Sequence, residues 1–86
     1  MSEGAAYAGT YRNDDGFAFV VSEATEGLSL QFRDGLPVLT YPISETEFRA
    51  KTVNLDVRFE RSHEGRISAM TVVQGGKAIR VIRQAG

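Results

Sequence analysis

The sequence predicts an all-β protein: a small closed or nearly closed barrel of eight antiparallel strands in up-and-down order. Three observations predict it. Apolar and polar residues alternate with a period of two, which places one set of side chains on each face of a strand. Glycine-containing turns interrupt the alternation at short intervals. The connections are too short for a crossover helix, so neighbouring strands must run antiparallel.

Eight strand-like segments follow one another along the chain, near residues 7–12, 16–23, 27–33, 36–42, 46–51, 53–61, 66–74 and 77–83. The alternation is clearest in three apolar series, which are Phe17, Phe19 and Val21, then Leu28, Leu30 and Phe32, and then Val53, Leu55, Val57 and Phe59. Turn residues that tolerate a positive φ separate the segments, and they are Asn13–Gly16, Glu26–Gly27, Asp34–Gly35, Ser62–Gly65 and Gly75–Gly76.

One region also has a helical signal. Ser44 is followed three residues later by Glu47, which is the spacing of a helix capping box. The β-branched and alternating residues that follow leave a helix nowhere to continue. We therefore predict a turn that enters a strand at Phe48.

Closure is predicted because eight strands nearly exhaust the 86 residues, and a flat meander would leave two exposed edges. An eight-stranded barrel has an interior that side chains fill, or one that holds a single small ligand. The bulky apolar residues favour a packed interior. An open β-sandwich or a Greek-key barrel would use the same alternation and stays as the alternative. Residues 1–86 form one domain, with residues 1–6 as a loose N-terminal segment.

Composition excludes several classes of protein. The chain is 42% apolar and 24% charged, which is ordinary for a soluble domain, and it has no cysteine for disulfides or thiolate metal sites. No apolar run approaches the ~20 residues of a membrane helix. The N-terminus, Met-Ser-Glu-Gly, lacks an export signal, so we expect the cytoplasm as the compartment and no membrane partner.

The formal net charge of −1 argues against a nucleic-acid binder. Residues 1–43 carry two basic and six acidic groups, whereas residues 44–86 carry eight basic and five acidic groups. We interpret this asymmetry as complementary charges on neighbouring strands. The alternative is a basic patch, and its residues would be Arg66, Lys77, Arg80 and Arg83.

No group of residues indicates a reaction, a cofactor or a metal. His63 is the one histidine and lies in a turn, and a metal site needs three or four converging ligands. Asp14 and Asp15 lack the twelve-position spacing of an EF-hand and fit a turn. Glu45 and Glu47 would project from the same side of a strand as solubilising charges. The nucleophile and phosphate-loop motifs are absent, so we predict no catalytic residue and no enzyme.

Two tyrosines flank a glycine in the first strand, as Tyr7-Ala8-Gly9-Thr10-Tyr11. A tyrosine cluster can form a binding surface. In a first strand it more often plugs one end of a barrel with its hydroxyl in water, and we favour the plug.

The order of these motifs resembles a known family. The Tyr-x-Gly-x-Tyr opening at Tyr7 is similar to that of the lipocalin-like C-terminal domain of serine β-lactamase-related hydrolases and peptidases. Further similarities follow in order at Gly27-Leu28, at Leu39, Pro42, Ser44, Thr46 and Phe48, and at Phe59-Glu60-Arg61, Gly65, Ile67 and Met70. The resemblance runs from about Tyr7 to Arg83 and implies an accessory module beside a catalytic domain. The family's nucleophile lies in a Ser-x-x-Lys motif on the other domain. This sequence has no such motif, so no catalytic residue is carried over.

These observations together predict a non-catalytic accessory or interaction module that acts through its surface or by self-association, without a cofactor. A small barrel without disulfides gains stability from such association. The alternative is a carrier that holds a small apolar ligand in the barrel interior. Its ligand-binding residues would be Phe17, Phe19, Phe32, Phe48 and Phe59.

Overall fold

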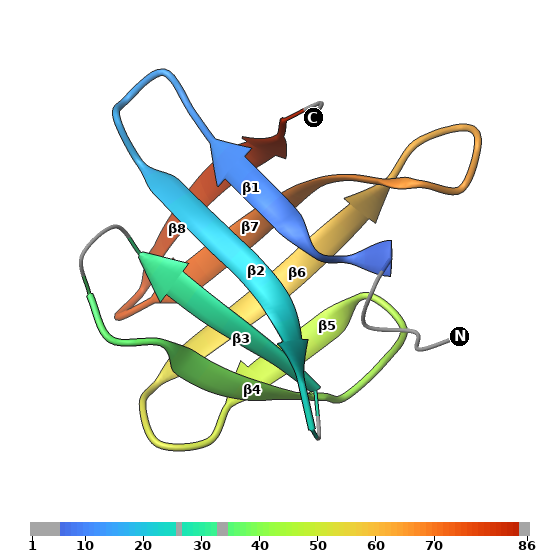
Figure 1. Ribbon diagram of the computed structural model, residues 1–86. Coiled ribbons are helices and arrows are strands. Elements are labelled where there is room, and N and C mark those ends of the chain that lie inside the picture. Colours follow the sequence, from blue (N-terminus) through green and yellow to red (C-terminus); the bar gives the residue numbers. More distant parts are fainter. Residues whose placement is uncertain (1–5, 26, 33–34, 85–86) are drawn as a thin grey trace.

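The computed structural model describes residues 6–25, 27–32 and 35–84, which form eight β-strands (Figure 1). The strands are β1 (Gly9–Arg12), β2 (Ala18–Ala24), β3 (Gly27–Phe32), β4 (Val38–Pro42), β5 (Glu47–Ala50), β6 (Leu55–Arg61), β7 (Ile67–Gln74) and β8 (Lys77–Arg83). Every predicted strand is present, with ends within two residues of the expected ones. The predicted loose segment at residues 1–6 lies outside the described residues, apart from Ala6.

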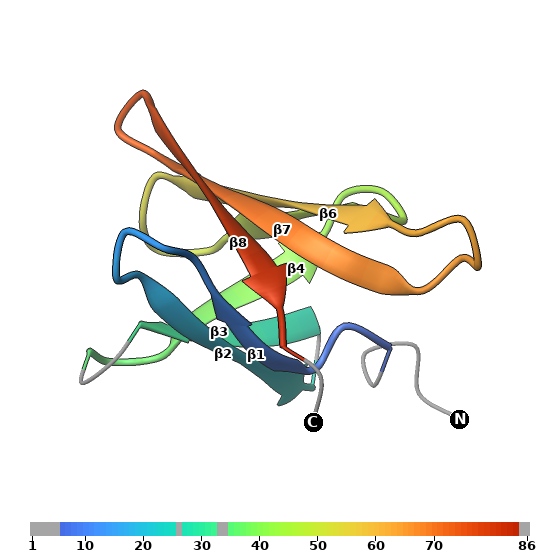
Figure 2. The same cartoon turned by 90° about the horizontal axis from the view of Figure 1, so that it is seen from above.

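The strands form one closed barrel in sequence order, each antiparallel to the next, with β8 pairing back to β1. The predicted up-and-down barrel is confirmed, and the sandwich and Greek-key alternatives are wrong. In the view from above, β6 and β7 lie across the interior from β2 and β3 (Figure 2). The closing ladder is short, with pairs Tyr11↔Arg83 and Arg12↔Ile82. The backbone N–H of Gln84 extends it by donating to the Thr10 carbonyl at 2.8 Å.

The alternation of apolar residues builds the core. In β2, Phe19 and Val21 are buried while Val20 and Ser22 are exposed. Directly opposed residues in antiparallel neighbours share a face, so the register brings buried residues together. Three such pairs are Val21↔Leu30, Phe48↔Val57 and Met70↔Val81.

The alternation fails at two strand ends. Phe32 and Val53 follow the inward-facing series in sequence, yet both side chains are exposed. Phe32 is the last residue of β3, and Val53 precedes β6 instead of belonging to it. Both therefore lie at the rim of the barrel, where the wall no longer covers an inward-facing side chain.

The region after Pro42 is a turn, as predicted. The Ser44 hydroxyl accepts the backbone N–H groups of Thr46 at 3.3 Å and Glu47 at 3.1 Å. This is the hydrogen bonding of a helix cap, but β5 begins at Glu47 and pairs with β4 and β6. Tertiary pairing thus decides between strand and helix where the local signal is ambiguous.

Candidate functional site

The interior of the barrel is filled. The void among the central residues has no room for a water molecule, and its walls are Val21, Leu28, Leu30, Thr40, Phe48, Val57 and Phe59. Thr40 is buried, and its hydroxyl donates to the Leu28 carbonyl at 2.9 Å. Its polar group is therefore satisfied within the wall and offers nothing to a ligand. The prediction of a packed barrel interior is confirmed by the absence of space for a water molecule among these residues.

The five phenylalanines predicted to surround a ligand form two separate groups. Phe48 and Phe59 are buried and stack edge to face, with ring centroids 5.6 Å apart. The second group consists of Phe17, Phe19 and Phe32, where the Phe17 and Phe19 rings lie 5.8 Å and 5.0 Å from that of Phe32. The two groups do not share one space, so at most three of the five could line one site.

The first group lies beneath a plugged end of the barrel. Tyr7 is buried, and its ring packs edge-on against Phe48 and Phe59 at centroid distances of 5.3 Å and 4.9 Å. Its hydroxyl donates to the Glu45 carbonyl. The Tyr11 hydroxyl donates to the Tyr7 carbonyl at 2.6 Å. The tyrosines therefore plug the barrel, as predicted, but both side chains are buried and their hydroxyls donate to backbone carbonyls, and Arg61 also donates to the Tyr7 hydroxyl at 3.5 Å.

Burial has an electrostatic effect at this end. It raises the pKa of Tyr11 to about 12, because the phenolate form would lose its hydration. The nearby Arg83 guanidinium opposes this shift. Arg83 also donates to the carbonyls of Ala6 at 3.1 Å, Ala8 at 2.6 Å and Ile67 at 3.2 Å. One side chain thus ties the segment before β1 to the start of β7.

The opposite end of the barrel carries an apolar rim, which we call the apolar mouth. Its members are Phe17, Phe32, Leu36, Val38, Val53 and Ile79. They converge because each lies at the same end of its strand or in an adjoining loop of the up-and-down barrel. Leu36 is 88% exposed, while Phe17, Val38 and Ile79 are partly buried against the core. The rim surrounds a pocket of about 250 Å³.

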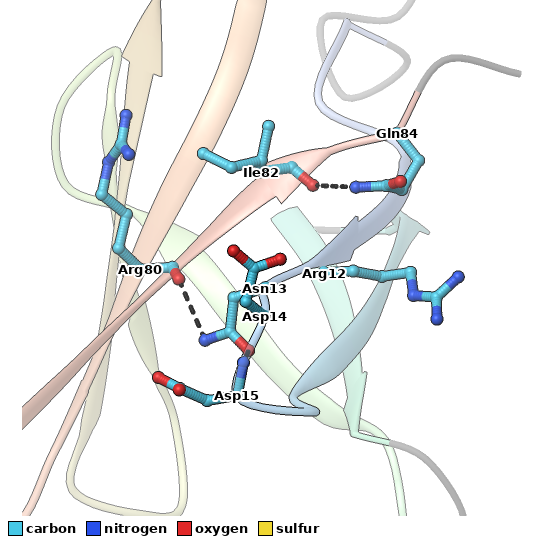
Figure 3. Close-up of a pocket in the computed structure, with 7 residues that line it drawn as sticks. All are labelled: Arg12, Asn13, Asp14, Asp15, Arg80, Ile82 and Gln84. Carbon is cyan, nitrogen blue, oxygen red and sulfur yellow. Dashed lines mark hydrogen bonds between the residues drawn. The ribbon is translucent and has the colours of Figure 1, made fainter.

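A larger but polar groove of about 610 Å³ lies outside the barrel, between the β1–β2 turn and β8 (Figure 3). Asn13 organises it: the side-chain carbonyl accepts the N–H groups of Asp15 and Phe17, both at 3.0 Å. The side-chain amide donates to the Arg80 carbonyl at 3.2 Å. Figure 3 shows that the guanidinium groups of Arg12 and Arg80 extend in different directions, so they do not converge on one ligand. Asp15 lies in the predicted turn.

The other titratable candidates stay apart. His63 is exposed in the turn from Ser62 to Gly65. Glu45 lies in the loop before β5, whereas Glu47 begins the strand, so the prediction that both project from one strand is wrong. Within residues 6–25, 27–32 and 35–84, no three histidine or acidic side chains come together to hold a metal ion.

The basic residues do not form one patch. Arg66 and Lys77 lie at opposite ends of the β7–β8 hairpin. Arg80 pairs with Glu60 at 2.7 Å and 3.0 Å, which lowers the pKa of that carboxyl. The Arg49–Asp56 pair at 3.1 Å joins the neighbouring strands β5 and β6, whereas Glu60 and Arg80 lie on β6 and β8, on either side of β7. All four residues lie within the basic half, residues 44–86, so these pairs do not join the acidic half of the chain to the basic half.

Sequence reasoning missed most of the apolar mouth. The alternation predicts Leu36, Val38, Val53 and Ile79 as ordinary strand residues, and of the mouth residues only Phe17 and Phe32 are predicted to bind a ligand. A usable signal exists, because apolar residues beside turns at corresponding strand ends must meet at one rim. Reading that signal requires the register and closure of the barrel, which the alternation alone does not give.

In the part of the chain that the structure describes, no helix is long and apolar enough to cross a bilayer. Searches against protein-family models, curated proteins and solved structures found no match to this chain.

Proposed function

We propose that this protein is a non-catalytic interaction module that acts through the apolar mouth. One observation carries the proposal: exposed apolar side chains gather at one end of the barrel, above a filled core, while the other end is plugged. Contiguous apolar patches on soluble proteins usually mark an interaction surface, whereas single exposed apolar residues need no explanation. The other exposed large apolar residues are scattered, with Val20, Leu39 and Ile82 on separate strands and Ile43 in the β4–β5 loop, so the mouth is the favoured surface.

The partner we propose is a second copy of the chain. In a two-fold dimer the same patch contacts itself, and an apolar mouth is complementary to another apolar mouth. None of the described residues that line the pocket at the mouth is charged, so two copies can meet there without burying a charge from that lining. A small barrel without disulfides also gains stability when a partner covers apolar surface.

The resemblance of Tyr7–Arg83 to the lipocalin-like domain of serine β-lactamase-related hydrolases supports an accessory role. Under this proposal the module contributes contacts, and the chemistry belongs to a separate catalytic domain. We also propose the cytoplasm as its compartment, which fractionation of cells that express the tagged chain would test.

Sedimentation velocity and native mass spectrometry over a wide concentration range test self-association. We expect a monomer–dimer equilibrium that Leu36→Glu shifts toward monomer. Burying a leucine contributes about 1.5–3 kcal/mol, and a symmetric dimer loses two of them, so the dissociation constant should rise by about 100-fold or more.

Leu39→Glu is the matched control, because Leu39 is 52% exposed on β4 but lies outside the apolar mouth. It should leave the dissociation constant nearly unchanged. A wild-type protein that stays monomeric at every concentration would refute the proposed dimer. Equal disruption by both variants would show that the mouth is not the contact surface.

The second candidate function, a carrier with an apolar ligand in the barrel interior, is less well supported. The central void does not admit a water molecule, so a ligand would have to displace buried side chains such as Phe48 and Phe59. Native mass spectra of freshly purified protein test this candidate as well, since a carried ligand would add mass to the chain.

A further inference from the structure

The pocket within the apolar mouth has the size and chemistry of a small-molecule site. We infer that it binds one small, uncharged aromatic molecule of about two fused rings, such as an indole. This inference goes beyond the proposed dimer and does not depend on it, because the ligand would lie below the rim of a single barrel.

Three aromatic rings form one side of the pocket. Phe32 lies between Phe17 and Phe19, with interplanar angles of 35° and 41° to them. Tilted rings at such distances present both faces and edges, which suits a further ring placed beside them. The exposure of Phe32 means that a ligand can reach this cluster without opening the core.

The floor of the pocket is aliphatic. Leu30, Leu55 and Val72 are buried beneath the mouth and close it off from the filled interior. Leu36 and Val53 stand at the outer edge, where they are exposed and can cover a ligand. Covering these exposed side chains and the ligand together removes apolar surface from water, which is the driving force for binding.

Size and polarity restrict the ligand. A closed apolar cavity of about 150 Å³ accommodates benzene, and sites for drug-sized molecules start near 300 Å³. The volume of about 250 Å³ lies between these and suits two fused rings. Among the described residues that line the pocket, Gln74 is the one with a polar side chain, and none is charged. The Gln74 amide oxygen can accept a hydrogen bond from one N–H or O–H group of the ligand. A charged ligand would lose its hydration in the pocket without gaining a partner of opposite charge.

The test is a titration with indole, followed by NMR of the side-chain methyl groups, at a concentration where the protein is monomeric. If the wild type is a dimer throughout, the dimer is titrated in the same way, because the ligand lies below the rim of each barrel. We expect saturable shifts of the Leu55, Val72 and Ile79 methyl signals. The Ile67 signal should stay in place, because Ile67 lies at the opposite end of β7 from the mouth. Indole-3-carboxylate, which is charged, should cause no saturable shift.

Val53→Glu places a carboxylate at the rim and should weaken indole binding by about 10-fold or more, because the ligand then desolvates a charge. Val20→Glu is the matched control: Val20 is 48% exposed, compared with 45% for Val53, but lies on the outer wall of β2. Its affinity for indole should stay within about two-fold of the wild type.

Absence of saturable shifts in the wild type overturns the inference, as does equal binding of the carboxylate. The wild-type titration needs no variant to fold. Dimerisation without indole shifts would refute the pocket ligand alone, whereas indole shifts in a protein that never dimerises would refute the proposed association alone.

Discussion

Replacing Gly27 with alanine should destabilise the barrel severely, although Gly27 lies at a strand end and not in the core. A Cβ atom at this position would lie 2.0 Å from the Thr40 carbonyl oxygen and 3.0 Å from the Tyr41 Cα. Both of these are backbone atoms, so the clash cannot be relieved by the movement of a flexible side chain. The methyl group can be accommodated only if β3 and β4 separate locally.

The cost follows from what that separation breaks. Overpacking of a tight contact costs typically about 1–3 kcal/mol. The same movement strains the buried hydrogen bond from the Thr40 hydroxyl to the Leu28 carbonyl, which is 2.9 Å long. Leaving those groups unsatisfied costs about 1–3 kcal/mol more. The sum of about 2–6 kcal/mol is a large part of the total stability of about 4–13 kcal/mol expected for a chain of this length.

Urea unfolding followed by circular dichroism measures this loss. Gly65→Ala is the control, since a Cβ there meets nothing within 4 Å and only its φ of +81° is unfavourable. That variant should lose about 1–2 kcal/mol from backbone strain alone. If Gly27→Ala retained wild-type stability to within about 1 kcal/mol, the argument from close strand contact would be refuted.

Two further predictions concern the plugged end. The Tyr11→Phe variant should have a free energy of unfolding about 1–2 kcal/mol lower than that of the wild type at neutral pH, because it lacks the hydrogen bond to the Tyr7 carbonyl. The pKa of Tyr11 is raised to about 12, so the wild type keeps this stability below pH 10, the ordinary pKa of tyrosine, and loses stability between pH 10 and 12. Urea unfolding should therefore show the difference between the two proteins shrinking over that range, and a constant difference would contradict the assignment. Arg83→Lys should lose about 1.5–3 kcal/mol, because an ammonium group cannot reach the three carbonyls of Ala6, Ala8 and Ile67. Hydrogen exchange should then accelerate first at the β1–β8 ladder, and uniform acceleration around the barrel would argue against a seam held by Arg83.

Predictions of strand position from local sequence were most accurate where the apolar alternation and the turn residues indicated the same strand ends. The segment 77–83 was predicted with both ends correct, because Gly75–Gly76 permits a tight turn and the apolar residues that follow repeat with period two. The Ser44 region shows the limit of local signals. The hydroxyl makes the hydrogen bonds of a helix cap, and only pairing with β4 and β6 turns the following residues into a strand.

Gly27 and the phenylalanines show what patterns cannot supply. The turn signal explains Gly27 as a turn residue. In the structure the Thr40 carbonyl of β4 occupies the position that a Cβ atom on Gly27 of β3 would need. The five phenylalanines were grouped by residue type, and the structure divides them between the plugged end and the apolar mouth. Distances between strands do not follow from the order of residues along one strand.

The order of residues along the chain is enough to predict the all-β class, the number and order of strands, and the filled interior, because these depend on alternation, turn residues and short connections that act locally. The tertiary structure alone decided that Tyr7 and Arg83 secure one end of the barrel and that Leu36, Val53 and Ile79 meet at the other. Both ends are assembled from residues far apart in the chain. Their proximity is set by the register and closure of the barrel, and it is at these ends that the proposed interactions take place.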